Sequence, residues 1–75
     1  MKKKSEKELI QAIGKRVAKL RLKKNISQAD LCYEAEIDLS TLSRLERGNL
    51  NFTIKTLIRI AKVLQVELDE FFIQE

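Results

Sequence analysis

Residues 27–48 read SQADLCYEAEIDLSTLSRLERG, and this stretch decides the fold of the chain. It contains two short amphipathic segments separated by a few residues, a pattern that predicts two helices joined by a tight turn. The spacing is demanding because five apolar positions must face one core. These positions are Leu31, Ala35, Ile37, Leu42 and Leu45. Cys32 falls where the two helices should cross, and a small buried residue is needed there because the helix axes approach closely.

One sequence pattern, which occurs four times along the chain, predicts the starts of four helices. An apolar residue precedes a candidate N-cap, and another follows it five positions later, which is the spacing of a hydrophobic staple. The pairs are Ile26 with Leu31, Ile37 with Leu42, Phe52 with Leu57, and Val66 with Phe71. The N-caps would be Ser27, Asp38, Thr53 and Glu67, so the helices should begin at about Gln28, Leu39, Ile54 and Leu68.

A longer helix should precede these four. From Leu9 onward, apolar residues recur at spacings of three and four, at Ile10, Ile13, Val17 and Leu20. Asn25 should end this helix, because Asn tolerates the left-handed conformation found at many helix C-termini. Residues 1–8 are expected to be a charged arm without regular structure, and residues 9–75 a single all-α domain of five helices.

Three further features concern helix ends and the core. Gly48 should end the third helix, whereas Glu36 and Gln65 stand where a left-handed residue is expected and Gly would be preferred. The fourth helix should carry the densest core face in the chain. Its predicted members are Ile54, Leu57, Ile58, Ala61 and Leu64.

The composition excludes several classes of protein. The chain has 75 residues, one Cys and no His, which rules out an internal disulfide framework, His-containing zinc sites and His-dependent catalytic arrangements. It also lacks a Gly-rich phosphate loop, so neither enzymatic activity nor a cofactor or metal is expected. Residues 1–4 begin as a signal peptide would, but the polar segment Ser5-Glu6-Lys7-Glu8 follows where an apolar region would have to be, so a cytoplasmic protein is expected.

The charge is unevenly distributed along the chain. Residues 1–24 carry ten Lys and Arg against two Glu, a net charge of +8, whereas residues 25–75 carry five against nine acidic residues, a net charge of −4. A basic first third suits a polyanionic partner such as nucleic acid, although a solvated helix face would show the same pattern. Residues 27–48 are acidic, with two Arg against five Asp and Glu.

The stretch 27–48 resembles the Cro/repressor-type (XRE) helix-turn-helix proteins. The resemblance rests on Ser27-Gln28-Ala29-Asp30-Leu31, Ala35-Glu36-Ile37 and Leu42-Ser43-Arg44-Leu45-Glu46-Arg47-Gly48, and continues through Thr53–Leu57, Ala61–Leu64 and Phe71-Phe72. It implies a five-helix, lambda-repressor-like DNA-binding domain. Glu36 departs from the usual Gly of the turn, and Phe52 stands where many members have Pro. The segment 51–54 looks most like the controller proteins of restriction-modification systems, which are small dimeric transcription regulators.

In such a domain the helix beginning at Leu39 would enter the DNA major groove by its N-terminal end. With Leu42 and Leu45 in the core, helical geometry leaves Leu39, Ser40, Thr41, Ser43, Arg44 and Arg47 outside. Arg44 is the best candidate for a bidentate bond to guanine. Ser40 and Thr41 could meet bases or phosphates. Leu39 could pack on a thymine methyl group or form part of the core.

Other residues are expected to contact the DNA backbone. Gln28 begins the second helix, where its amide and the helix N-terminus would face a phosphate. The resemblance implies the same role for Gln28 and Ser43, and a partly buried ion pair between Arg21 and Glu46. Arg16, Lys19, Asn49 and Asn51 are further candidates, and each is equally well read as an ordinary exposed polar residue.

One helix-turn-helix reads only a few base pairs, so a homodimer on palindromic double-stranded DNA is expected, with half-sites about 34 Å apart. Leu68, Phe72 and Ile73 could form the dimer interface, or could simply close the core. The alternative function is a protein-interaction module, antitoxin-like or anti-repressor-like, that turns the acidic helix-turn-helix against a basic partner. No small-molecule effector is evident.

Overall fold

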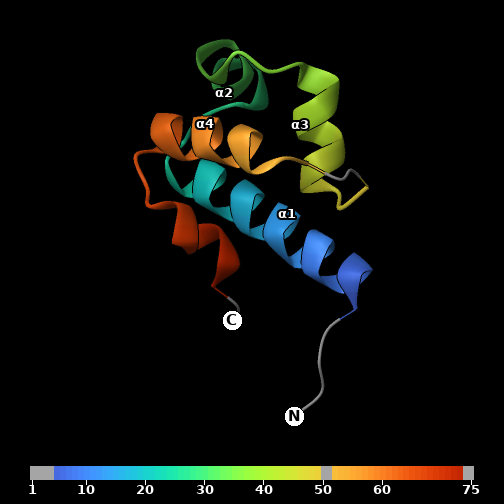
Figure 1. Ribbon diagram of the computed structural model, residues 1–75. Coiled ribbons are helices and arrows are strands. Elements are labelled where there is room, and N and C mark those ends of the chain that lie inside the picture. Colours follow the sequence, from blue (N-terminus) through green and yellow to red (C-terminus); the bar gives the residue numbers. More distant parts are fainter. Residues whose placement is uncertain (1–4, 50–51, 74–75) are drawn as a thin grey trace.

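The computed structural model describes residues 5–49 and 52–73 and contains, within them, only helices (Figure 1). Four α-helices are followed by one 3-10 helix, in agreement with the predicted all-α domain of five helical segments. Their bounds are α1 Glu6–Lys23, α2 Gln28–Ala35, α3 Leu39–Glu46, α4 Ile54–Leu64 and η1 Leu68–Phe72. None of the described helices has the length and apolar character needed to cross a membrane.

The four helices predicted from the staple pairs begin at the expected residues. Ser27 caps α2, with its hydroxyl oxygen accepting from the Asp30 N–H at 3.0 Å. Thr53 caps α4 in the same way, accepting from the Thr56 N–H at 3.2 Å. Asp38 has the extended backbone of an N-cap, but its side chain makes no capping hydrogen bond. The staple spacing therefore located α3 correctly without help from the Asp38 carboxylate.

The start of α1 was predicted three residues too late. Helix α1 begins at Glu6 because Ser5 and Glu8 form a complete capping box. The Glu8 N–H donates to Ser5 Oγ at 3.1 Å, and the Ser5 N–H donates to Glu8 Oε1 at 2.9 Å. Residues 6–8, assigned above to a charged arm, are thus the first turn of the helix.

All four α-helices end with the chain in the left-handed conformation, which any residue other than Gly adopts at a cost. The left-handed residues are Asn25, Glu36, Gly48 and Gln65, as predicted. After α3 the Gly48 N–H donates to the Leu45 carbonyl oxygen and the Asn49 N–H to that of Arg44. This pair of bonds is a Schellman motif.

The core is formed by buried residues from every helix. Helix α1 packs against α3 and η1, while α2 packs against α3 and α4. On α4 the buried residues are Leu57, Ile60, Ala61 and Leu64. The predicted core face was wrong at Ile54 and Ile58, which are exposed, and it missed Ile60. Helical spacing allows two overlapping apolar faces here, and contact with α2 and η1 selects the one containing Ile60.

Candidate nucleic-acid interface

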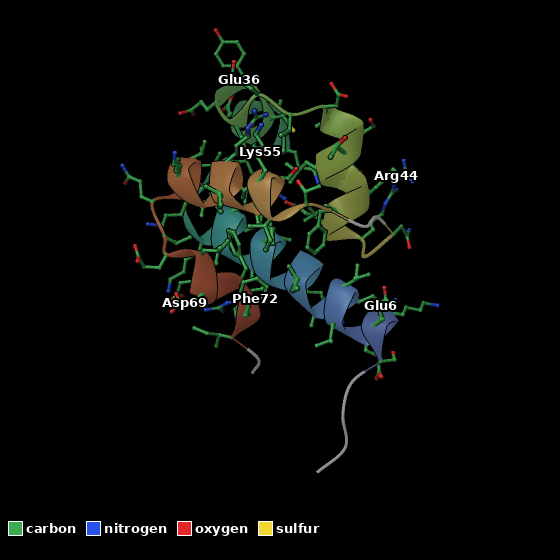
Figure 2. The ribbon with its side chains drawn as sticks, in the orientation of Figure 1. Glu6, Glu36, Arg44, Lys55, Asp69 and Phe72 are labelled. Carbon is green, nitrogen blue, oxygen red and sulfur yellow. The ribbon has the colours of Figure 1, made fainter. Side chains whose placement is uncertain are left out.

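Helix α3 has one face in the core and another in solvent. Leu42 and Leu45 are completely buried, whereas Ser40, Arg44 and Arg47 are exposed. Thr41 and Ser43 are half-buried at the boundary. In Figure 2 the Arg44 side chain points outward from α3, away from the rest of the bundle. The residues expected to read DNA bases therefore lie along one accessible side of α3.

Leu39 lies at the N-terminal end of α3. The exposed fraction of its side chain bears on whether it belongs to the core or is available to DNA. It is 52% exposed and does not belong to the buried core. The fold thus covers about half of this side chain, and the exposed half is available for contact with an apolar group such as a thymine methyl.

The C-terminal end of α3 is fixed tightly against α1 by two glycines. A Cβ atom added at Gly14, in the middle of α1, would collide with the carbonyl oxygen of Leu45. A Cβ atom at Gly48 would lie only 2.6 Å from Cγ of Gln11. The sequence reading missed the role of Gly14, although a glycine inside a helical pattern is itself a signal of close packing.

The ion pair implied for Arg21 and Glu46 is present and is buried, with the side chains 10% and 7% exposed. Arg21 Nε donates to Glu46 Oε2 at 2.7 Å and Arg21 Nη2 donates to Oε1 at 3.1 Å, a bidentate arrangement. Arg21 Nη1 also donates to the Ile26 carbonyl oxygen at 2.8 Å. The guanidinium thus joins α1, the end of the α1–α2 connection and the end of α3.

Gln28 joins the same network. Its Nε2 donates to Glu46 Oε1 at 2.9 Å, so the first residue of α2 is tied to the last residue of α3. Sequence reasoning had assigned the Gln28 amide to a DNA phosphate. In the structure one of its two N–H donors is already bound, which leaves the other donor and the amide oxygen.

Cys32 is buried where α2 meets the start of α3, as predicted from its size. Its Sγ lies 3.6 Å from the Asp38 carbonyl oxygen. Burial raises the pKa of the thiol above its ordinary value, and the nearby Glu46 and Asp38 carboxylates raise it further, against a smaller lowering by Arg21. The thiolate is therefore disfavoured, and Cys32 acts as packing and not as a nucleophile.

Arg16 was expected to contact the DNA backbone, but in the structure its side chain is bound to Glu70. Its Nε donates to the Glu70 carbonyl oxygen at 2.9 Å, and its Nη2 lies 3.2 Å from Glu70 Oε1. The guanidinium thus fastens η1 to α1, which counts against its use on DNA. Lys19 and Asn49 are exposed, and Asn51 lies outside the described residues.

The charges on the helix-turn-helix surface match the acidic count of the sequence. Asp30, Glu34, Glu36 and Asp38 are all exposed. The basic helix α1 does contact α3, but the contacts described above are with the C-terminal end of α3. Leu39 and Ser40 lie at the other end of an eight-residue helix, about 12 Å away along its axis.

The expected dimer residues lie on η1 and immediately after it. Phe72 and Ile73 are 44% and 47% exposed, while Leu68 is half-buried and packs against the core and Phe71 is buried. Leu68 therefore serves the core in part, and the other two form an apolar surface. In Figure 2 Phe72, on η1, lies well apart from Arg44, on α3.

The chain was compared with protein families and with solved structures. The model of the HTH_3 family, described as helix-turn-helix, matches residues 17–71. This match spans α2 and α3 and most of the core. A search of curated proteins finds no match.

Among the described residues there is no cluster of acidic and Cys side chains that could hold a metal ion.

Several solved structures share this fold over most of the chain. The restriction-modification controller protein C.AhdI from Aeromonas hydrophila is 30% identical, with a TM-score of 0.82, and the alignment covers 84% of this chain and 96% of that one. The controller protein C.Esp1396I is 36% identical, with a TM-score of 0.79 and coverages of 92% and 88%. An HTH_3 family transcriptional regulator from Vibrio cholerae is 25% identical, with a TM-score of 0.85, and is matched over 91% of this chain and 38% of its own length.

Proposed function

This chain belongs to the HTH_3 helix-turn-helix family of DNA-binding regulators, and we propose that it controls transcription by binding a palindromic operator as a homodimer. The observation that carries the proposal is α3, whose buried face is rigidly held and whose opposite face presents Arg44 to solvent. A helix of this kind fits the DNA major groove, which is the only groove that displays a distinct pattern for each base pair.

In this proposal Arg44 reads guanine, and Leu39, Ser40 and Thr41 complete the contact with the bases. The phosphate contacts come from Gln28, Ser43, Arg47, Asn49, Asn51 and Lys19. Arg16 is left out because its guanidinium is bound to Glu70. Because residues 27–48 are acidic, most attraction to phosphate must come from the basic residues of the first third, and affinity should fall steeply with added salt.

The decisive experiment is one conservative substitution at Arg44. A preferred duplex is first selected from a random pool by the wild-type protein, and affinity for it and for a scrambled duplex is then measured by gel shift. Arg44→Lys keeps the positive charge but cannot form the bidentate pair of hydrogen bonds to guanine. It should therefore reduce the preference for the selected duplex about tenfold or more, with little change on the scrambled one.

The matched control is the same substitution on α4, Arg59→Lys at an exposed position, which should leave the preference unchanged. The proposal is wrong if the wild-type protein binds no duplex at low salt. Sequence-specific reading by α3 is wrong if the Arg44→Lys protein keeps its full preference.

We further propose that the protein is the controller of a restriction-modification system. Support comes from its similarity to C.AhdI and C.Esp1396I, both of which are controller proteins aligned over at least 80% of both chains. The check is the gene neighbourhood: a methyltransferase gene and an endonuclease gene should lie beside the gene for this protein, with the selected duplex sequence upstream. Their absence would contradict this assignment while leaving DNA binding intact.

A second function is favoured by one observation, the exposure of all four acidic residues Asp30, Glu34, Glu36 and Asp38. Such a surface would suit a basic protein partner in a protein-interaction module. Failure to bind DNA at low salt, combined with capture of a basic protein that a Glu34→Lys variant no longer binds, would favour this second function.

A further inference from the structure

The side chain of Gln28 is held from one side by a group that can only accept hydrogen bonds. Glu46 lies at the end of α3 with its carboxylate almost completely buried, and its Oε1 receives Gln28 Nε2 at 2.9 Å. Both oxygens of the carboxylate are also bound to Arg21. Arg21 thus holds the carboxylate in place, and the carboxylate in turn holds the amide.

This contact decides which end of the amide faces which way. An amide carries a donor nitrogen and an acceptor oxygen, and the two ends are similar in shape. Beside a carboxylate only the nitrogen end is favourable, so Glu46 fixes the amide in a single orientation. Gln28 Nε2 has a second N–H, and this donor lies on the residue that begins α2, where the free backbone N–H groups of the first helical turn also lie.

The charge of Glu46 would ordinarily discourage an anion from approaching this position. The bidentate bond from Arg21 balances that charge, so the pair as a whole is neutral. The site at the start of α2 therefore combines helix N–H groups with a side-chain donor of fixed orientation, the chemistry that a DNA phosphate requires.

We infer that Glu46 is a positioning residue for phosphate binding, acting through the amide of Gln28 and not by touching DNA. This inference rests on the proposed function, since it names how one phosphate is bound at that same interface. Without the Glu46 acceptor the amide can turn and present its oxygen, which a phosphate repels.

The test is a double-mutant cycle measured as DNA affinity. Gln28→Ala and Glu46→Gln are made singly and together, and the dissociation constant for the selected duplex is measured by fluorescence anisotropy. In the wild-type background Gln28→Ala should weaken binding about tenfold, because a hydrogen bond to a charged group is lost. In the Glu46→Gln background the same substitution should weaken binding less than about twofold.

A matched control uses Glu34, which is exposed on α2 and makes the same change of charge when replaced by Gln. In the Glu34→Gln background, Gln28→Ala should still weaken binding about tenfold. A purely structural role for Glu46 would give the same cost of Gln28→Ala in all three backgrounds, once each protein is shown to be folded by circular dichroism.

A second measurement needs no variant at Glu46. In the wild-type protein the two Gln28 side-chain amide protons are followed by NMR as duplex is added. One proton should stay protected from exchange throughout, and the other should shift on binding. Equal exchange of both protons, or additive affinities with DNA binding intact, would overturn the inference while leaving the proposed function standing. Absence of DNA binding by the wild-type protein would overturn both.

Discussion

Three residues other than glycine hold the left-handed conformation, and each lies within two residues of the end of a helix. Asn25, Glu36 and Gln65 have φ values of 62°, 59° and 58°, whereas the end of α3 uses Gly48 at 77°. Asn adopts this conformation with little strain, but Glu and Gln have longer side chains and no comparable preference. The backbone of the turn between α2 and α3 is therefore determined by packing of the flanking helices and not by the residue in the turn.

Replacing these two residues with glycine should stabilise the protein. Glu36→Gly and Gln65→Gly each remove the strain of a left-handed side chain, and we expect a gain of about 0.5–1 kcal/mol after the entropic cost of glycine. Urea unfolding followed by circular dichroism measures the difference. Unfolding free energies that are unchanged or lower in both variants would show that these positions are not strained.

Gly14 should respond in the opposite direction. By helix propensity alone, Gly14→Ala in the middle of α1 would stabilise by about 1 kcal/mol. The added methyl group would instead collide with the Leu45 carbonyl oxygen, a backbone atom that cannot turn aside. We expect a loss of about 1–3 kcal/mol, measured by urea unfolding. Any increase in stability would mean that α1 and α3 are not in close contact at this point.

At the scale of elements, helix starts were predictable and helix contacts were not. The staple pairs located the starts of α2, α3, α4 and η1 because a cap and its two apolar neighbours are local in sequence. The start of α1 was missed although Ser5 and Glu8 have the spacing of a capping box, because they stand in a highly charged segment.

In the candidate site, too, local geometry was predictable from the sequence and long-range contacts were not. The exposed side of α3 followed from helical geometry once Leu42 and Leu45 were placed in the core. The bond between Arg16 and Glu70 joins residues 54 positions apart, and the bond between Gln28 and Glu46 joins residues 18 apart. A local sequence pattern cannot predict which residues so far apart in the chain will form a hydrogen bond. The Arg21–Glu46 pair was anticipated only because the family resemblance implied it.

Two ion pairs of α1, Arg21–Glu46 and Arg16–Glu70, should differ sharply in what they contribute to stability. Glu46→Ala leaves Arg21 buried without its partner and should cost about 3–5 kcal/mol. Glu70→Ala breaks the pair with Arg16, but the Glu70 side chain is 39% exposed, so water replaces it and the cost should not exceed about 1 kcal/mol. Urea unfolding of both variants tests the contrast. Similar losses would mean that burial does not separate the two pairs.

At the scale of the whole molecule, the two surfaces proposed for DNA and for the second subunit lie apart. In Figure 2 Arg44 lies at the outer edge of α3 and Phe72 lies on η1, well apart in the view. Arg16 fastens η1, which carries Phe72, to α1, and α1 is in turn packed against α3. The two surfaces are thus connected through one continuous helix, so dimer formation would fix the separation of two recognition helices.

Phe72→Asp should separate the subunits. The substitution places a charge in the apolar surface formed by Phe72 and Ile73, and the monomer should bind a palindromic duplex about 100-fold more weakly because it engages one half-site at a time. Tyr33→Asp is the matched control, since Tyr33 is an 85% exposed aromatic residue on α2. Sedimentation equilibrium and gel shift measure both effects. A Phe72→Asp protein that remains dimeric would place the subunit contact elsewhere.

Because α3 is held at its C-terminal end, the residues at its N-terminal end should tolerate substitution. Gly14, Gly48 and the Arg21–Glu46 pair hold the C-terminal end of α3, and none of them is among the exposed residues at its start. Exchanging Leu39 or Ser40 should therefore change stability by no more than about 0.5 kcal/mol. Under the proposed function, the residues that hold the fold and the residues that read bases are then separable, so single substitutions could change the preferred operator without unfolding the domain.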